Sequence, residues 1–235
     1  MNLNTDFLFA PQPYREMWER QHRLFDEMVR LKRDGITPQT GHILMLQHEP
    51  VITLGRHGNE SNLLMASELE RRGIECIRIE RGGDITYHGP GQLVTYLIID
   101  LEQFHLGIKS YINLLEEAVI RTLDDFAIKG ERVEGATGVW IGAGTPQERK
   151  ICAIGVKCSR YVTMHGLALN VSTDLDAFRL INPCGFTDKG VTSLEREWGD
   201  QVMLHHVAPK LDHYLRQLLQ ESASGTSHRS ADCSD

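Results

Sequence analysis

The chain has 235 residues, a formal net charge of -7 and 41% hydrophobic residues, values typical of one globular domain. The negative charge argues against general nucleic-acid binding, which needs a basic surface. Five cysteines without CxxC spacing argue against a disulfide framework or a structural zinc site. No apolar run has the length of a membrane span and no signal pattern is present, so we expect a cytoplasmic protein without a membrane partner.

Helices are expected at the start, middle and end of the chain, with strands clustered between them. Apolar periodicity predicts helices over 13–33, 67–73, from Ser110 to about 126, 174–178 and 207–221, and strands over 42–48, 51–55, 74–80, 92–101, 139–142, 150–157 and 161–171. Ser67, paired with Glu70, and Ser110 are the expected N-caps.

This order of elements favours an α+β fold with a mixed, mostly antiparallel sheet that carries its helices on one face. No internal linker is rich enough in proline, glycine or serine to divide the chain. We expect a single domain over residues 1–221. Residues 222–235, rich in serine and small polar residues, are expected to form a disordered tail.

A glycine-rich run, Arg81-Gly82-Gly83-Asp84-Ile85-Thr86-Tyr87-His88-Gly89-Pro90-Gly91-Gln92, leads into one of the predicted strands. Glycines at such positions let a ligand approach the main chain. The run contains neither GxxxxGK[ST] nor a GxGxxG that opens a helix, so it is not a phosphate loop. Its composition also fits a tight hairpin at Gly89-Pro90-Gly91, and this alternative stays open on the residues alone.

Cys184 is the strongest candidate for a nucleophile, because it lies between a proline and a glycine in a predicted tight turn. Cys76 and Cys152 lie in apolar strand patterns, where cysteine is often a small buried hydrophobe. Cys233 lies in the expected tail. Cys158, at the end of a strand, is a modest rival.

Two lysines and two histidines could assist such a thiol. Lys150 and Lys157 are seven positions apart in one predicted strand, so they should face opposite sides and only one can enter a cleft. His88 and His165 are candidates for proton transfer or for positioning, of which positioning is favoured. A local basic group of Arg71, Arg72 and Arg78 could contact an acidic partner.

The run from Arg81 to Gln92, continued to Tyr96, closely resembles the signature of the lipoyl(octanoyl) transferase family. Residues 150–155, 165–170 and 181–185 resemble the family's later blocks in the same order, and together the blocks cover about 44–194. The resemblance implies the fold of the biotin and lipoate ligase catalytic domain. It also implies transfer of an octanoyl group from acyl carrier protein to a lysine of a lipoyl domain.

The resemblance implies a role for each matched residue. Cys184 would be the nucleophile that forms an acyl thioester, and Lys150 would lower the pKa of its thiol. The implied substrate-binding residues are Arg81, Gly82, Gly83, Asp84, Ile85, Thr86, Tyr87, His88, Ala153, Ile154, Gly155, Gly166, Leu167 and Ala168. Gly82, Gly83 and Gly155 are expected to leave an apolar slot open for the acyl chain.

No cofactor and no metal are implied. The implied donor is octanoyl-acyl carrier protein, and the implied acceptors are lipoyl domains of 2-oxoacid dehydrogenases and the glycine cleavage H protein. Three alternatives remain: an ATP-dependent lipoate or biotin ligase of the same fold, a cysteine hydrolase that uses Cys184 with His165 or His88, and a non-catalytic module that binds acyl carrier protein.

Overall fold

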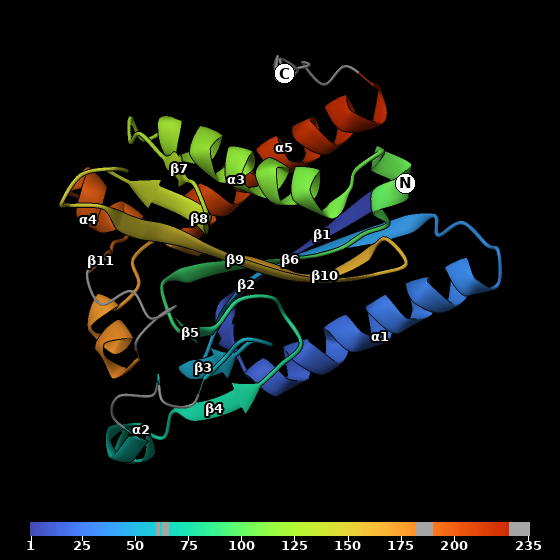
Figure 1. The fold of residues 1–235 in the computed structure, drawn as a ribbon. Coiled ribbons are helices and arrows are strands. Elements are labelled where there is room, and N and C mark those ends of the chain that lie inside the picture. The colour runs from blue at the N-terminus through green and yellow to red at the C-terminus, as the bar shows by residue number, and fades with distance from the viewer. Residues whose placement is uncertain (60–61, 63–65, 182–189, 226–235) are drawn as a thin grey trace.

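The computed structural model describes residues 1–59, 62, 66–181 and 190–225 (Figure 1). The proposed nucleophile Cys184 and residues 226–235 of the expected tail therefore lie outside the described residues. None of the described helices is long and apolar enough to cross a membrane.

In the described chain, eight strands form one main sheet, in the order β1-β2-β6-β10-β9-β8-β7 with β11 beside β9. The strands are β1 (Asn2–Gln12), β2 (Thr40–His48), β6 (Gln92–Ile98), β7 (Glu131–Val133), β8 (Ala136–Ile141), β9 (Arg149–Ser159), β10 (Val162–Asn170) and β11 (Gly190–Val191). The β1–β2 and β11–β9 pairs are parallel and the others antiparallel. The expected mixed, mostly antiparallel sheet is thus confirmed.

A smaller sheet of β4 (Glu75–Arg78), β3 (Val51–Leu54) and β5 (Ile85–His88) lies beside the main one (Figure 1). Strand β5 is part of the glycine-rich run and pairs with β3, whereas the following β6 pairs with β2 and β10. The segment Gly89-Pro90-Gly91 therefore carries the chain from one sheet to the other. The hairpin alternative is wrong.

Helices cover both faces of the main sheet, not one face as expected. Helices α3 (Ile108–Asp124) and α5 (Leu204–Ala223) lie on one face, and α1 (Tyr14–Arg33) lies on the other (Figure 1). The reason is the burial of the central strands, because every residue of β6 and β10 is buried and both of their faces need a cover.

The helix α1 shows how the sequence pattern produces this packing. Its buried residues include Met17, Phe25 and Met28, which follow helical spacing and pack against Leu44 and Val94 of the main sheet. The last turn carries Arg30, Lys32 and Arg33, whose positive charges stabilise the negative end of the helix dipole. The predicted helix and its apolar face are confirmed.

Several short or exposed elements were not predicted. These are β1, β5, β7, β11, helix α4 (Leu194–Trp198) and the 3-10 turn η2 (Leu101–Phe104). The predicted helix at 174–178 is the 3-10 turn η3 (Leu175–Leu180). Strand β1 is an edge strand whose residues are half-buried or exposed, so it has no clear apolar alternation.

The predicted caps of two helices are wrong, and the last helix is longer than predicted. Helix α2 (Ala66–Arg72) begins before Ser67, and α3 begins after Gly107, which places Ser110 inside its first turn. Helix α5 begins at Leu204, before the predicted start at 207. It also continues to Ala223, past the expected domain end at 221.

Candidate active site

A cavity of about 390 Å³ lies between the main sheet and the small sheet, on the face covered by α1. Its walls come from β5, β6, β8, β9 and β10, with Tyr14 from α1 and Phe178 from η3. All the substrate-binding residues that the resemblance implies, apart from Gly82 and Tyr87, line this cavity. The separate sequence blocks are therefore brought together in one place.

Tyr87 and Gly82 have other positions. The ring of Tyr87 packs edge-on against Phe178, with 5.6 Å between ring centroids, and belongs to the apolar cluster of the small sheet. The backbone N–H of Gly82 donates to the carbonyl oxygen of Val156 at 3.0 Å. That contact fixes the glycine-rich run against β9.

Lys150 lines the cavity because a β-bulge interrupts the alternation of β9. Val139 pairs with Cys152 and Trp140 with Lys150, so Ile151 is an extra residue. Ile151 and Cys152 both face the core beneath α3. The bulge therefore turns Lys150 to the cavity face of the sheet.

The prediction that Lys150 and Lys157 face opposite sides is consequently wrong. The ammonium of Lys157 lies 4.9 Å from the ring centroid of Phe25, on the α1 face, and 3.6 Å from a carboxylate oxygen of Glu80. Of these two lysines, Lys150 lines the cavity and Lys157 does not. Lys157 instead connects β9 to helix α1 and to the end of the small sheet.

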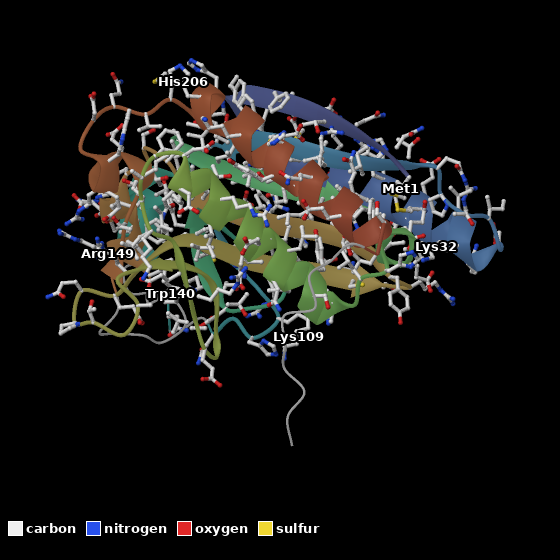
Figure 2. All side chains as sticks on the ribbon, turned by 90° about the horizontal axis from the view of Figure 1, so that it is seen from above. Met1, Lys32, Lys109, Trp140, Arg149 and His206 are labelled. Atoms are coloured by element: carbon white, nitrogen blue, oxygen red, sulfur yellow. The ribbon has the colours of Figure 1, made fainter. Side chains whose placement is uncertain are left out.

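The Lys150 ammonium has two neighbours that orient it. It donates a hydrogen bond to the carbonyl oxygen of Thr137 at 3.1 Å and lies 4.5 Å from the ring centroid of Trp140. Trp140 is almost fully buried and donates its own N–H to Ala136, so its ring is a rigid support. Figure 2 shows Trp140 near Arg149, the residue before Lys150, at the end of the molecule opposite Lys32.

Of the described residues that flank the segment 182–189, Val191 lies beside this lysine. Ile181 is buried in the cluster of the small sheet. Val191 pairs with Lys150 in the parallel β11–β9 ladder and lines the cavity. Cys184 belongs to this segment, and its own position is outside the described residues.

The described cysteines, Cys76, Cys152 and Cys158, do not line the cavity. Cys152 is fully buried, and burial raises the pKa of its thiol far above the usual range. Cys158 is exposed at the end of β9, and partial desolvation raises its pKa as well. Neither thiol has the lowered pKa that a nucleophile needs.

A chain of buried amides holds His88 at the cavity wall. Asn170 donates to the carbonyl oxygen of Thr192 at 3.0 Å, and Gln92 donates to the side-chain oxygen of Asn170 at 2.9 Å. Because the amide nitrogen of Gln92 points to Asn170, its side-chain oxygen points to His88 and accepts a hydrogen bond from Nδ1–H at 2.7 Å. Burial, the largest effect, and nearby His48 lower the pKa of His88 to about 3, so it is neutral.

A second chain holds Tyr96. His48 Nδ1–H donates to the carbonyl oxygen of Gln12 at 3.0 Å, so its Nε2 accepts from the hydroxyl of Tyr96 at 2.7 Å. Burial lowers the pKa of His48 to about 4. The hydroxyl of Tyr14 interacts with that of Tyr96, and burial raises the pKa of both.

These chains contain residues that the sequence did not single out. Gln92 ends the glycine-rich run and Asn170 ends the matched block 165–170. Their positions in these blocks could have identified them as site residues. Tyr96 ends the matched signature and gave the same signal. Tyr14 and His48 gave none, because a tyrosine or histidine in an apolar element is usually part of the core.

Arg81 supports the glycine-rich run. One of its terminal N–H groups donates to the carbonyl oxygen of Thr53 at 2.8 Å and to its hydroxyl at 2.9 Å, and another to Gly82 at 3.0 Å. A Cβ on Gly155 would lie 2.8 Å from the carbonyl oxygen of Gly82 and 3.1 Å from Arg81 Cδ. Gly155 lines the cavity, and it is also needed for contact between this run and β9.

Among the residues that the structure describes, no three His, Cys, Asp or Glu side chains form a group that could hold a metal ion. The cavity is lined by small and apolar residues, among them Val94, Ala153 and Ala168, and by polar residues that include Lys150 and His88. It can hold an extended apolar group with its polar end near Lys150.

The fold is that of lipoate and biotin protein ligases. The lipoate protein ligase of Thermoplasma acidophilum superposes with a TM-score of 0.69 at 18% identity, over 95% of this chain and 90% of that one. A biotin protein ligase of Aquifex aeolicus superposes with a TM-score of 0.50 at 14% identity, over 95% and 72%. The fold predicted from the sequence is confirmed.

The family described as "Lipoyl protein ligase A/B catalytic domain" matches residues 13–216, and the chain belongs to this family. An octanoyltransferase of Bacteroides thetaiotaomicron is 53% identical over 210 residues, covering 89% of this chain and 92% of the relative. An octanoyltransferase of Flavobacterium johnsoniae is 48% identical over 214 residues, covering 88% and 92%. The resemblance to octanoyltransferases is therefore confirmed.

Proposed function

We propose that this chain is an acyltransferase that moves an octanoyl group from a thioester donor to a lysine of a lipoyl-domain protein. The similarity to octanoyltransferases, 53% identity over 89% of the chain, carries this conclusion. The cavity with Lys150 at its wall supports it, because an acyl chain needs an apolar slot beside the reacting groups. An ATP-dependent ligase is the less favoured alternative.

In the first half-reaction, the Cys184 thiolate attacks the carbonyl carbon of the donor thioester. The bond between that carbon and the donor sulfur breaks, and the octanoyl group remains on Cys184. The donor sulfur takes a proton from the Lys150 ammonium and leaves as a thiol, so Lys150 is neutral when the acceptor arrives. The ammonium of Lys150 favours the thiolate. The pairing of Val191 with Lys150 supports this role, because the chain that follows Cys184 returns beside the lysine.

In the second half-reaction, the amine of the acceptor lysine attacks the acyl-cysteine. The carbon–sulfur bond breaks and an amide forms, while the proton lost by the amine passes to Lys150 and the thiolate of Cys184 is restored. The amide is more stable than the thioester, so this step drives the transfer without nucleotide. Neutral, hydrogen-bonded His88 fits a positioning role in this scheme.

The cavity accounts for recognition of the acyl chain. Each methylene group that leaves water contributes about 0.8 kcal/mol, so an eight-carbon chain contributes several kcal/mol. Arg81, Gly83, Ala153 and Ala168 line the cavity and would contact that chain or its thioester.

The expected donor is octanoyl-acyl carrier protein, and the expected acceptors are lipoyl domains of 2-oxoacid dehydrogenases and the glycine cleavage H protein. We expect the chain to act in the cytoplasm. The basic group proposed to meet the carrier is partly neutralised, because Arg71 and Arg72 both pair with Glu68. Charge attraction from this group is therefore expected to be weak.

The test is the intact mass of the protein after incubation with octanoyl-acyl carrier protein, before and after a lipoyl domain is added. The proposal predicts an octanoyl adduct that is absent in Cys184→Ala and moves to the acceptor. Cys158→Ala, which removes an exposed thiol away from the cavity, should behave as the wild type. Transfer that requires free octanoate and ATP instead, or release of free octanoate without transfer, would contradict the proposal.

A further inference from the structure

Helix α3 carries a buried carboxylate on the side that packs against the main sheet. Glu116 is 6% exposed, and the buried residues around it on α3 include Leu115 and Val119 of the largest apolar cluster. One carboxylate oxygen accepts from the side-chain N–H of Arg132 at 3.1 Å. Taking a carboxylate out of water costs free energy even when it is paired, whereas an apolar residue would fill the same place without that cost. The carboxylate therefore indicates a role besides packing.

The second oxygen of Glu116 is connected to Lys150 through a single peptide group. It accepts from the main-chain N–H of Gly138 in β8 at 3.0 Å. The carbonyl oxygen of the same peptide group belongs to Thr137 and accepts from the Lys150 ammonium at 3.1 Å. The N–H and C=O of a trans peptide group point in opposite directions. This peptide group therefore lies across the sheet, with its N–H toward α3 and its carbonyl oxygen toward the ammonium of Lys150.

The backbone at Gly138 fits this orientation of the peptide group. Its φ is 121°, and a Cβ there would overlap the carbonyl oxygen of Cys152 and lie 3.5 Å from Cε of Lys150. The side chain of Lys150 thus passes directly beside Gly138. A peptide group whose N–H donates to a carboxylate has a more strongly polarised carbonyl oxygen. The contact with Glu116 therefore both directs and strengthens the hydrogen bond that Lys150 donates.

We propose that Glu116 is a positioning residue, which holds the Thr137–Gly138 peptide group so that its carbonyl oxygen fixes the Lys150 ammonium at the cavity wall. Glu116 does not line the cavity itself. Two hydrogen bonds and one peptide group separate its carboxylate from the ammonium, and at that separation its negative charge also favours the charged form of the lysine. The effect on octanoyl transfer rests on the proposed function, whereas the effect on Lys150 does not.

Glu116→Gln tests the effect of the charge, because the amide has nearly the same size and its oxygen can still accept from Gly138. Glu117→Gln is the matched control. Glu117 is the next residue of α3 and pairs with the same Arg132 at 2.9 Å, but the N–H of Gly138 donates to Glu116. The measurement is the rate at which acetic anhydride acetylates Lys150, followed by peptide mass as a function of pH. This reagent reacts with the neutral amine and requires no acyl transfer by the protein.

The midpoint of Lys150 acetylation should fall by about one pH unit in Glu116→Gln, because loss of a nearby negative charge disfavours the ammonium. It should be unchanged in Glu117→Gln, and Lys157 of the same strand serves as an internal reference in each sample. All variants keep the other titratable groups that line the cavity, which are Tyr14, Arg81, Asp84, His88, Tyr96 and His165. A wild-type midpoint in Glu116→Gln, or an equal fall in Glu117→Gln, would overturn the inference.

Glu116→Ala tests the positioning, because it removes the acceptor of the Gly138 N–H. In the folded variant, kcat for octanoyl transfer should fall on the order of tenfold or more with little change in KM for the acyl donor, whereas Glu117→Ala should resemble the wild type. Glu116→Gln should recover much of the loss.

A folded Glu116→Ala with the wild-type kcat would also overturn the inference. If this variant does not fold, the acetylation of Glu116→Gln decides. A wild type that transfers no octanoyl group would instead contradict the proposed function, and the acetylation result would still test the contact with Lys150.

Discussion

At the scale of single residues, buried hydrogen bonds with fixed directions shape the site. A backbone carbonyl oxygen can only accept a hydrogen bond. His48 must therefore donate to the carbonyl oxygen of Gln12, and Asn170 to that of Thr192, and these two contacts determine which group donates in each following hydrogen bond. His48 and His88 are consequently held as neutral rings whose second nitrogens accept. Both rings are poorly suited to carry a proton at neutral pH, which favours Lys150 as the group that does so.

The lowered pKa of His48 predicts a loss of stability in acid. Its pKa is about 4 in the folded protein and about 6.5 in the unfolded chain, so the unfolded chain binds more protons below pH 6.5. The contribution is fully present above pH 6.5 and is lost as the pH falls toward 4. For His48 this amounts to about 2 kcal/mol between pH 7 and pH 5.

His48→Gln should reduce this dependence, because an amide can donate to Gln12 and accept from Tyr96 without titrating. The measurement is the free energy of unfolding in urea at pH 7 and pH 5 for both proteins. His42→Gln, at a half-buried histidine whose pKa is lowered by burial, serves as a comparison. An equal pH dependence in the wild type and His48→Gln would contradict the assignment.

At the scale of elements, the bulge in β9 decides which lysine reaches the cavity. The bulge lies opposite Val139 and Trp140. Next to them is Gly138, whose φ is 121° and whose missing Cβ leaves room for the carbonyl oxygen of Cys152. The N–H of Gly138 donates to the buried carboxylate of Glu116 at 3.0 Å. Strand β8 thus shapes the bulge, and the bulge orients Lys150.

Gly138→Ala should disturb this bulge, with a loss of about 1–3 kcal/mol in stability and a larger fractional loss of activity than of folded protein. Gly135→Ala is the control, since Gly135 also has a positive φ of 74° but no atom within 4 Å of its Cβ position. Urea unfolding and the rate of octanoyl transfer measure the two effects. Equal activity per folded molecule in both variants would show that the bulge does not position Lys150.

At the scale of the whole molecule, chemistry and stability are divided between the two faces of the main sheet. The face under α3 and α5 carries the largest apolar cluster, while the opposite face carries the cavity, α1 and the small sheet (Figure 1). The central strands β6 and β10 belong to both layers. This explains why their sequences are almost continuously apolar and still contain site residues.

Much of this arrangement could be predicted from the sequence. Apolar residues at helical spacing predict α1, and nearly continuous apolar runs predict β2, β6 and β10, because buried elements need apolar side chains at regular positions. The order of the sequence blocks gave the family and most residues of the cavity wall. Strand β1 was missed because an exposed edge strand lacks the pattern, and the placement of helices on both faces depends on packing that no single segment encodes.

The error at the site has a local physical cause. The bulge at Ile151 turns Lys150 to the same side of the sheet as Lys157, where opposite sides were expected. It breaks the two-residue alternation from which the side-chain directions were predicted. The close approach of Gly82 to Gly155 was not predicted, because a sequence does not show which backbone segment comes close to a glycine.

In the proposed mechanism, Lys150 holds the thiol of Cys184 as a thiolate. The rate at which iodoacetamide alkylates Cys184, followed by peptide mass as a function of pH, measures the pKa of this thiol. We expect a midpoint well below the usual thiol pKa of about 8.5, a rise of that midpoint in Lys150→Met, and a low midpoint in Lys150→Arg, which keeps the charge. A midpoint near the usual value in the wild type, unchanged in Lys150→Met, would contradict it.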